Sequence, residues 1–215
     1  MFGAPEDPIR IGLVSDLARP GGNATGINTF SQELIAKRLR LLHDLVPKAV
    51  RLVVLINPSN KSSTQTTLQE IRKAAPTMGL QLKTVLKAET IAEIDVAFAT
   101  LAHERAEILF VAPDAFFNSR GVQFATLAAR ERIPTAYSAR EIVAVGGLMS
   151  YGADLADMSR QVGVYTGNIL KEAKPADMPV LQSTKFEFAI NLQTARTLGI
   201  EVPPGVLSIA DEVIE

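Results

Sequence analysis

The stretch Leu52-Val53-Val54-Leu55-Ile56-Asn57-Pro58-Ser59-Asn60 leads from a continuous apolar run into a polar turn. Five consecutive apolar residues, three of them β-branched, indicate a strand that is covered on both faces. A helical pattern follows, with an apolar face formed by Leu68, Ile71, Ala75 and Met78. A buried strand, a polar turn and an amphipathic helix in this order are typical of an α/β fold with a parallel sheet.

The same alternation continues along the rest of the chain. The expected strands are Ile9–Val14, Leu52–Ile56, Leu80–Leu86, Ile108–Val111, Pro134–Tyr137, Gly147–Ser150 and Phe186–Ile190. Apolar stripes at helical spacing separate most of them. Strand and helix in repeated alternation predict a doubly wound parallel α/β sheet with right-handed crossovers.

Several helix ends are marked in the sequence. Thr90 with Glu93, and Ser138 with Glu141, have the spacing of a capping box and predict two helix starts. Pro76 falls in the last turn of the helix that begins after Asn60. We therefore expect that helix to end or kink just before the proline.

Composition excludes several classes of protein. The 215 residues include 22 Lys and Arg against 23 Asp and Glu. The chain thus lacks the surplus of basic residues that is typical of nucleic-acid-binding proteins. Cysteine is absent, which rules out disulfides and thiolate metal sites. No apolar run reaches the roughly 18 residues of a membrane span. Residues 1–8 lack a cationic start followed by an apolar run, so we expect no export signal in this chain.

The polar turn after Leu52–Ile56 is the first candidate site. Ligands of open α/β sheets bind at the carboxyl ends of strands, near helix N-termini. Unpaired backbone N–H groups of a helix start suit a carboxylate. The polar side chains gathered there are Asn57, Ser59, Asn60, Ser62 and Ser63. The alternative is an ordinary turn with a helix N-cap, because the same residue types are common in both.

Two residues at neighbouring strand ends complete the candidate site. Asp114 directly follows Ile108–Val111, where its carboxylate can pair with a ligand amine. It can equally cap the helix that begins near Phe116. Tyr137 ends the next expected strand, where its ring can stack on a flat ligand or simply pack in the core.

No constellation for catalysis or metal binding stands out. His43 and His103 lie on polar helix faces without clustered ligands, so we expect neither a metal nor a cofactor. Neither a Gly-x-Ser-x-Gly elbow nor a Gly-x-x-x-x-Gly-Lys phosphate loop is present, and the glycines of 21–26 indicate a turn. An enzyme on this scaffold is therefore the less favoured interpretation.

Six stretches spread over the whole chain carry a resemblance to one family. They are Leu17–Gly26, Asn57–Asn60, Gly146–Gly152, Lys174–Pro179, Thr184–Leu192 and Ala210–Ile214. Together they resemble the ABC transporter substrate-binding proteins of the tryptophan and tyrosine type. The resemblance implies a type I periplasmic-binding-protein fold, in which two Rossmann-like lobes hold a small-molecule solute between them. It also implies an ABC permease in the membrane as partner and a periplasmic location for the full-length protein.

The resemblance further implies how the chain divides. Residues 1–28 would be a remnant of the first lobe and hinge, residues 29–144 a complete second lobe, and residues 145–215 the hinge return and the C-terminal part of the first lobe. The leading strands of the first lobe would precede Met1. The resemblance thus implies an N-terminally truncated member of the family. A sheet edge exposed in this way favours a homodimer.

Residue by residue, the resemblance implies roles for the candidate site. The helix start at Asn57, Ser59, Asn60, Ser62 and Ser63 matches a carboxylate-binding loop, Asp114 matches the position of an amine ligand, and Tyr137 falls on the pocket wall. The implied solute carries a carboxylate and is an amino acid, in particular an aromatic one, or a related compound. The alternative is a ligand-sensing regulatory module of the same fold, which would need a helix-turn-helix segment or a basic patch.

Overall fold

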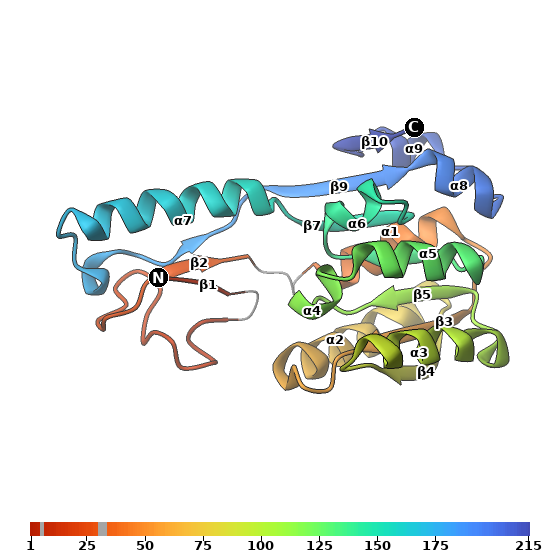
Figure 1. The fold of residues 1–215 in the computed structure, drawn as a ribbon, viewed down its shortest axis with the longest axis horizontal. Coiled ribbons are helices and arrows are strands. Elements are labelled where there is room, and N and C mark those ends of the chain that lie inside the picture. Colours follow the sequence, from red (N-terminus) through yellow and green to blue (C-terminus); the bar gives the residue numbers. More distant parts are fainter. Residues whose placement is uncertain (5–6, 30–33) are drawn as a thin grey trace. The chain divides into compact units, whose positions relative to one another are not determined.

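The structure is a computed structural model that describes residues 1–4, 7–29 and 34–215. The chain forms two compact units, drawn in Figure 1. The smaller unit combines Met1–Glu33 with Ala153–Phe186, and the larger combines Leu34–Gly152 with Glu187–Glu215. The chain therefore passes between the units after residues 33, 152 and 186.

The larger unit is built on a seven-stranded sheet with the order β10-β9-β7-β6-β5-β3-β4 in the described residues. Its strands are β3 (Arg51–Ile56), β4 (Gln81–Lys87), β5 (Ile108–Val111), β6 (Thr135–Tyr137), β7 (Met149–Ala153), β9 (Phe186–Asn191) and β10 (Glu212–Ile214). β3 pairs in parallel with β4 and β5, and β5, β6 and β7 continue in parallel. The α/β class and the parallel sheet are thus confirmed.

Helices cover both faces of this sheet (Figure 1). They are α1 (Ile35–Leu45), α2 (Lys61–Ala74), α3 (Ile91–Glu104), α4 (Ala115–Asn118), α5 (Gly121–Arg130), α6 (Arg140–Ala144), α8 (Leu192–Leu198) and α9 (Pro204–Leu207). Every residue of the run Leu52–Ile56 is buried in β3, as its continuous apolar character predicts.

Aromatic side chains form the centre of the core on one face of the sheet. The Phe124 ring lies 5.8 Å from Phe98, 5.4 Å from Phe117 and 6.1 Å from Tyr137 between ring centroids, each pair edge to face. All four rings are fully buried. Edge-to-face contacts add to the hydrophobic gain from burying these side chains.

Local sequence signals predict several helix ends correctly. Thr90 and Glu93 form the expected capping box at the start of α3. α2 ends at Ala74, and a short 3-10 helix, η1 (Ala75–Met78), carries the chain through Pro76. Gly79 then ends the segment in the left-handed conformation, at φ 73°.

Two sequence-based expectations are wrong. Ile9–Val14 forms turns instead of a strand, because Asp7 Oδ1 accepts the Ile9 N–H at 2.9 Å and Gly12 adopts φ 75°. Ser138 and Glu141 do not form a capping box. α6 begins one residue later, after Ala139, and the Ser138 hydroxyl donates instead to Asn118 Oδ1 at 3.2 Å.

In its described residues, the smaller unit holds a three-stranded parallel sheet with the order β1-β2-β8. Its elements are β1 (Phe2–Ala4), β2 (Gly26–Asn28), α7 (Leu155–Leu170), the 3-10 helix η2 (Pro175–Asp177) and β8 (Leu181–Gln182). A Cβ on Gly26 would lie 2.2 Å from the Phe2 carbonyl oxygen, so this strand pair requires glycine there. These strands have three residues or fewer, too short for a periodic signal.

Asp157 joins α7 to the segment after β8 in the smaller unit. Its carboxylate accepts from Arg160 at 2.7 Å, from Lys185 at 3.2 Å and from Gln161. The Arg160 bond is the main cause that lowers the pKa of this carboxyl to about 2, with Lys185 and Gln161 acting in the same direction. The charged form is thus favoured by folding.

Asp157→Asn is therefore expected to remove a pH-dependent part of the stability. Because the folded pKa lies below the unfolded value of 3.8, the carboxylate stabilises the fold above about pH 4. That contribution is lost as the pH falls towards 2. Thermal unfolding of the parent and the variant from pH 6 to pH 2 measures it. The parent should be the more stable at pH 6, and a gap that stays constant down to pH 2 would contradict the assignment.

The boundaries of the two compact units do not test the predicted lobes, because a unit is defined by its internal contacts. Residues 145–152 and 187–215 cluster with the larger unit, because β7, β9 and β10 belong to its sheet. Residues 153–186 cluster with the N-terminal segment. The assignment of either unit to a particular lobe stays a prediction.

Candidate functional site

Two loops meet where β3 and β5 end in the larger unit. The Asn57 side-chain amide donates to Asp114 Oδ1 at 3.2 Å, and the Asn60 amide donates to Asp114 Oδ2 at 3.1 Å. β3 and β5 are neighbours in the sheet, so their carboxyl ends bring these residues together across more than 50 positions of sequence. The structure thus joins the first two parts of the predicted site.

Asp114 also caps a helix. Its Oδ1 accepts the backbone N–H groups of Phe116 at 3.0 Å and Phe117 at 3.2 Å, which fixes the start of α4. Within the part of the chain that the structure describes, Oδ1 accepts three hydrogen bonds, whereas Oδ2 accepts the one from Asn60. A carboxylate oxygen has about two lone pairs. Oδ2 is consequently the oxygen of Asp114 with room for a ligand donor.

The start of α2 is organised by Asn60 and Ser63. Asn60 Oδ1 accepts the Ser63 N–H at 3.2 Å and so caps the helix. The Ser63 hydroxyl is buried and donates to the Pro113 carbonyl oxygen at 2.7 Å. Asn60 and Ser63 therefore bind the α2 start to the loop before α4, which gives them a structural role in the site.

Ser59 and Ser62 occupy the outer side of the same turn. Ser59 is exposed and its N–H donates to Asn57 Oδ1 at 3.1 Å, while Ser62 is half-buried in the first turn of α2. Lys61, the first residue of the helix, is exposed beside them. The positive end of a 14-residue helix, with hydroxyls and a cation around it, favours an anion electrostatically.

Tyr137 lies in the core. Its side chain is fully buried against Phe124, and its hydroxyl has no hydrogen-bond partner among the described residues. Burial raises the pKa of Tyr137 well above its usual value. The alternative of core packing accounts for the ring contact, and a place on a pocket wall stays a prediction.

A buried arginine near the end of β7 was missed by the sequence analysis. Arg38 in α1 is fully buried, its Nε donates to the Tyr151 carbonyl oxygen at 2.7 Å, and its guanidinium lies 5.6 Å from the Phe110 ring centroid. Its two terminal nitrogens have no partner in the described part of the chain. Burial lowers the pKa of Arg38 to about 9.

A signal for this arginine was available in the sequence. Leu34, Arg38, Leu41 and Leu45 recur at the spacing of one helix face, so Arg38 interrupts an apolar stripe. The neighbouring Lys37 Nζ donates to the Tyr151 hydroxyl at 2.7 Å. Both basic side chains of the first turn of α1 therefore donate hydrogen bonds to Tyr151. Tyr151 is followed by Gly152, the last residue before the chain leaves the larger unit.

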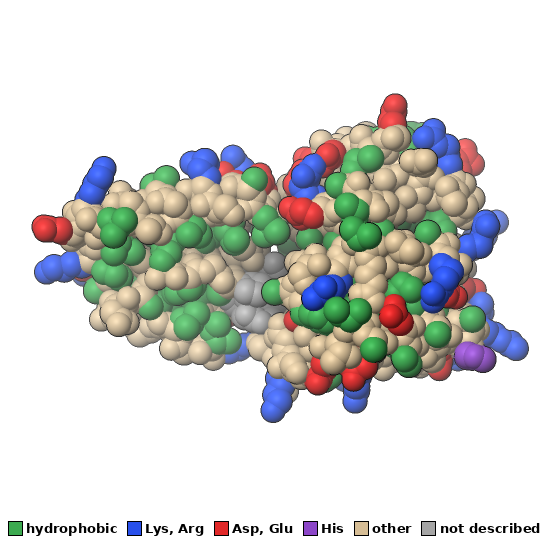
Figure 2. Space-filling view, viewed as in Figure 1, with side chains coloured by type: hydrophobic (Ala, Val, Ile, Leu, Met, Phe, Trp, Pro, Cys, Tyr) green, Lys and Arg blue, Asp and Glu red, His purple; other side chains and the backbone are tan. Residues whose placement is uncertain are grey.

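The surface charge of the larger unit is mixed. Cationic and anionic side chains are interspersed on the visible face of the larger unit (Figure 2). Among residues 1–4, 7–29 and 34–215, no group of three or more His, Asp and Glu side chains is placed to hold a metal ion. No helix of the described chain is long and apolar enough to cross a membrane.

Comparison with known proteins identifies the family. The profile of the family described as "ABC transporter substrate binding protein" matches residues 1–214. The chain belongs to this family. A curated relative, the tyrosine-binding protein of Clostridioides difficile (strain R20291), is 27% identical over 199 residues, which are 92% of this chain and 56% of the relative. The chain thus spans little more than half the length of that protein.

Solved structures agree with this assignment. The ABC domain from Streptococcus pneumonia in complex with L-Trp is 31% identical, with a TM-score of 0.81 over 98% of this chain and 72% of that one. A conserved domain protein from Vibrio cholerae, 24% identical, shares the fold with a TM-score of 0.85 over 96% of this chain and 68% of its own. The predicted family and its periplasmic-binding-protein type of fold are therefore confirmed.

Proposed function

We propose that this chain is the solute-binding component of an ABC importer and that it binds a small carboxylate-bearing solute, an aromatic amino acid or a related compound, in an interlobe cleft. The observation that carries the proposal is the junction of the Asn57–Ser63 loop with Asp114 at the carboxyl edge of the larger sheet. The relatives support the solute class, since one is named a tyrosine-binding protein and another was solved with L-Trp.

The geometry suits the two ends of an amino acid. The start of α2, with the exposed Ser59 beside it, offers N–H and O–H donors to a carboxylate. Asp114 Oδ2 offers an acceptor for the amine. Recognition of this kind makes and breaks no covalent bonds, so the function that we propose is not enzymatic. In this proposal it acts in the periplasm and delivers the solute to a membrane permease. A homodimer stays a prediction.

Calorimetry and thermal shift with matched ligands test the proposal. L-tryptophan and L-tyrosine are compared with tryptamine and tyramine, which keep the ring and amine but lack the carboxylate. At about 100 times the dissociation constant, an amino acid should add about 2.7 kcal/mol and raise the midpoint by about 5–10 °C. The decarboxylated compounds should give no shift. Equal shifts for tryptamine, or none for any carboxylate-bearing compound, would overturn the proposal.

Ser62→Asp is expected to separate solute binding from stability. A carboxylate in the first turn of α2 interacts favourably with the helix dipole and should leave stability unchanged or raise it by about 0.3–1 kcal/mol. The same charge repels a bound carboxylate, and we expect at least a tenfold loss of affinity, about 1.4 kcal/mol. Gln69→Glu, an equal charge change on an exposed position of α2, is the control. Undiminished affinity in Ser62→Asp would place the solute carboxylate elsewhere.

A further inference from the structure

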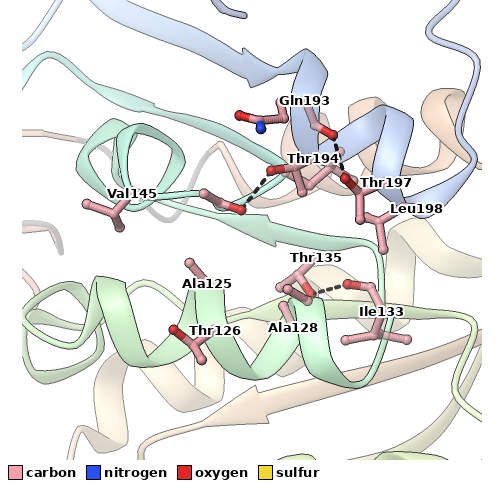
Figure 3. Close-up of a pocket in the computed structure, with 13 residues that line it drawn as sticks. Ala125, Thr126, Ala128, Ile133, Thr135, Val145, Gln193, Thr194, Thr197 and Leu198 are labelled. Carbon is pink, nitrogen blue, oxygen red and sulfur yellow. Dashed lines mark hydrogen bonds between the residues drawn. The ribbon is translucent and has the colours of Figure 1, made fainter.

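A cavity of about 300 Å³ lies between α5 and α8 in the larger unit (Figure 3). Its floor includes Thr135, the first residue of β6, and Leu148, which precedes β7. It therefore opens at the amino ends of these strands, whereas Asn57 and Asp114 follow the carboxyl ends of β3 and β5. The cavity and the proposed solute site share no residue.

The threonine hydroxyls that line the cavity donate their hydrogens within the protein. Four lining threonine hydroxyls each donate to a backbone carbonyl oxygen at 2.8–2.9 Å: Thr126 to Val122, Thr135 to Ile133, Thr194 to Gly146 and Thr197 to Gln193. A hydroxyl has one hydrogen and two lone pairs, so Thr126, Thr194 and Thr197 can offer a ligand only an acceptor. Thr135 is fully buried behind them. The one lining side chain with amide hydrogens, Gln193, is exposed.

The remainder of the lining is apolar and uncharged. Alanine side chains of α5, together with Ile133, Leu148 and Leu198, face the space between the helices, and the lining includes no Lys, Arg, Asp or Glu. An anion would find neither a cation nor a free hydroxyl hydrogen there and would lose its hydration without compensation. A neutral ring with an O–H or N–H group matches both the apolar walls and the free lone pairs.

Hydrogen bonds fix the α8 side of the cavity. Asn191 accepts the Thr194 N–H at 2.9 Å and donates from its side chain to the Val143 carbonyl oxygen at 3.2 Å, which ties α8 to the segment before β7. That segment requires its glycines, since Gly146 has φ 107° and a Cβ on Gly147 would lie 2.8 Å from the Ile142 carbonyl oxygen. These contacts order one side of the cavity without a ligand, as is usual for ligand sites.

We propose that this cavity is a second binding site, for a small neutral aromatic molecule of the phenol or indole class. Its volume is at the lower end of the range of small-molecule pockets and suits one ring or two fused rings. The ring packs against the apolar walls, and the O–H or N–H group donates to a threonine oxygen. The inference is independent of the proposed solute site.

Nuclear magnetic resonance of the ¹⁵N-labelled 215-residue chain tests which class of small molecule the cavity binds. Each small molecule is added up to about 1 mM. Phenol and indole are expected to shift the amide signals of 125–135, 145–148 and 193–198. Benzoate, which carries a carboxylate where phenol carries its hydroxyl, should leave them unshifted. Anisole and 1-methylindole, which lack the donor hydrogen, should bind at least fivefold more weakly than their parents. Equal shifts with benzoate, or none with any probe, would overturn the proposal.

Two variants that fill the cavity from different helices locate the binding. Ala128→Leu on α5 and Thr197→Leu on α8 should each lower the affinity for phenol and indole at least tenfold. Thr100→Leu is the matched control, because Thr100 is a helical threonine outside the cavity with the same bond to the carbonyl oxygen four residues earlier. Since Thr197 is exposed, its variant remains informative if Ala128→Leu fails to fold. Unchanged affinity in the Thr197 variant would contradict the site.

Discussion

Phe124→Ala is expected to lower the free energy of unfolding of the larger unit by about 3–5 kcal/mol. Phe124 is fully buried and its ring contacts those of Phe98, Phe117 and Tyr137. Removing it leaves a cavity among three aromatic rings that the helices cannot close without shifting. Urea unfolding followed by circular dichroism measures the loss.

Val122→Ala is the control for Phe124→Ala. It removes an apolar side chain from the same helix, but Val122 is 66% exposed, so its loss should change stability by less than about 0.5 kcal/mol. A destabilisation below about 1 kcal/mol in Phe124→Ala would mean that the aromatic cluster is not part of the cooperative core.

Asp114→Ala is expected to affect both stability and binding. The variant loses the cap of α4 and leaves the Asn57 and Asn60 amides without their acceptor, which should cost about 2–4 kcal/mol of stability. If Asp114 Oδ2 holds the solute amine, the variant should also lose about 1.5–3 kcal/mol of binding free energy. This corresponds to a fall in affinity on the order of 10- to 100-fold. Chemical unfolding and calorimetry with L-tryptophan measure the two effects separately.

Asp114→Asn distinguishes the cap from the ligand contact. The asparagine keeps an oxygen that can accept from Phe116 and Phe117, and asparagine caps helices as well as aspartate does. It should therefore recover much of the stability while its affinity for the solute stays low, because the charge is lost. If its affinity equals that of the parent, Asp114 serves only as the junction between the two loops.

The two candidate sites of the larger unit have opposite chemistry because of their surroundings. The start of α2 presents donors and a positive helix end, and so favours an anion. The threonine hydroxyls of the cavity between α5 and α8 present only acceptors in a largely apolar, uncharged lining, and so favour a neutral donor. Binding of one class of ligand at one site therefore predicts nothing about the other.

Signals that act over a few residues were sufficient to predict much of the fold. The run Leu52–Ile56 can be satisfied only by burial on both faces, and the Thr90–Glu93 box closes within one turn. Asn60 and Asp114 were recognised as possible caps for the same reason. Ile9–Val14 failed as a strand because Asp7 and Gly12 favour local turns over pairing with a distant strand.

The sequence by itself determined the α/β class and the polar residues at the strand ends, because periodicity and capping are encoded within short windows. The family was indicated by the resemblance of six stretches of the chain. Only the tertiary structure decided which of those residues meet. Asn57 and Asp114 bond across the junction of two neighbouring strands, Arg38 is buried through a partner in β7, and the cavity is formed by helices some 60 residues apart. These contacts depend on how elements distant in sequence pack, which no local pattern specifies.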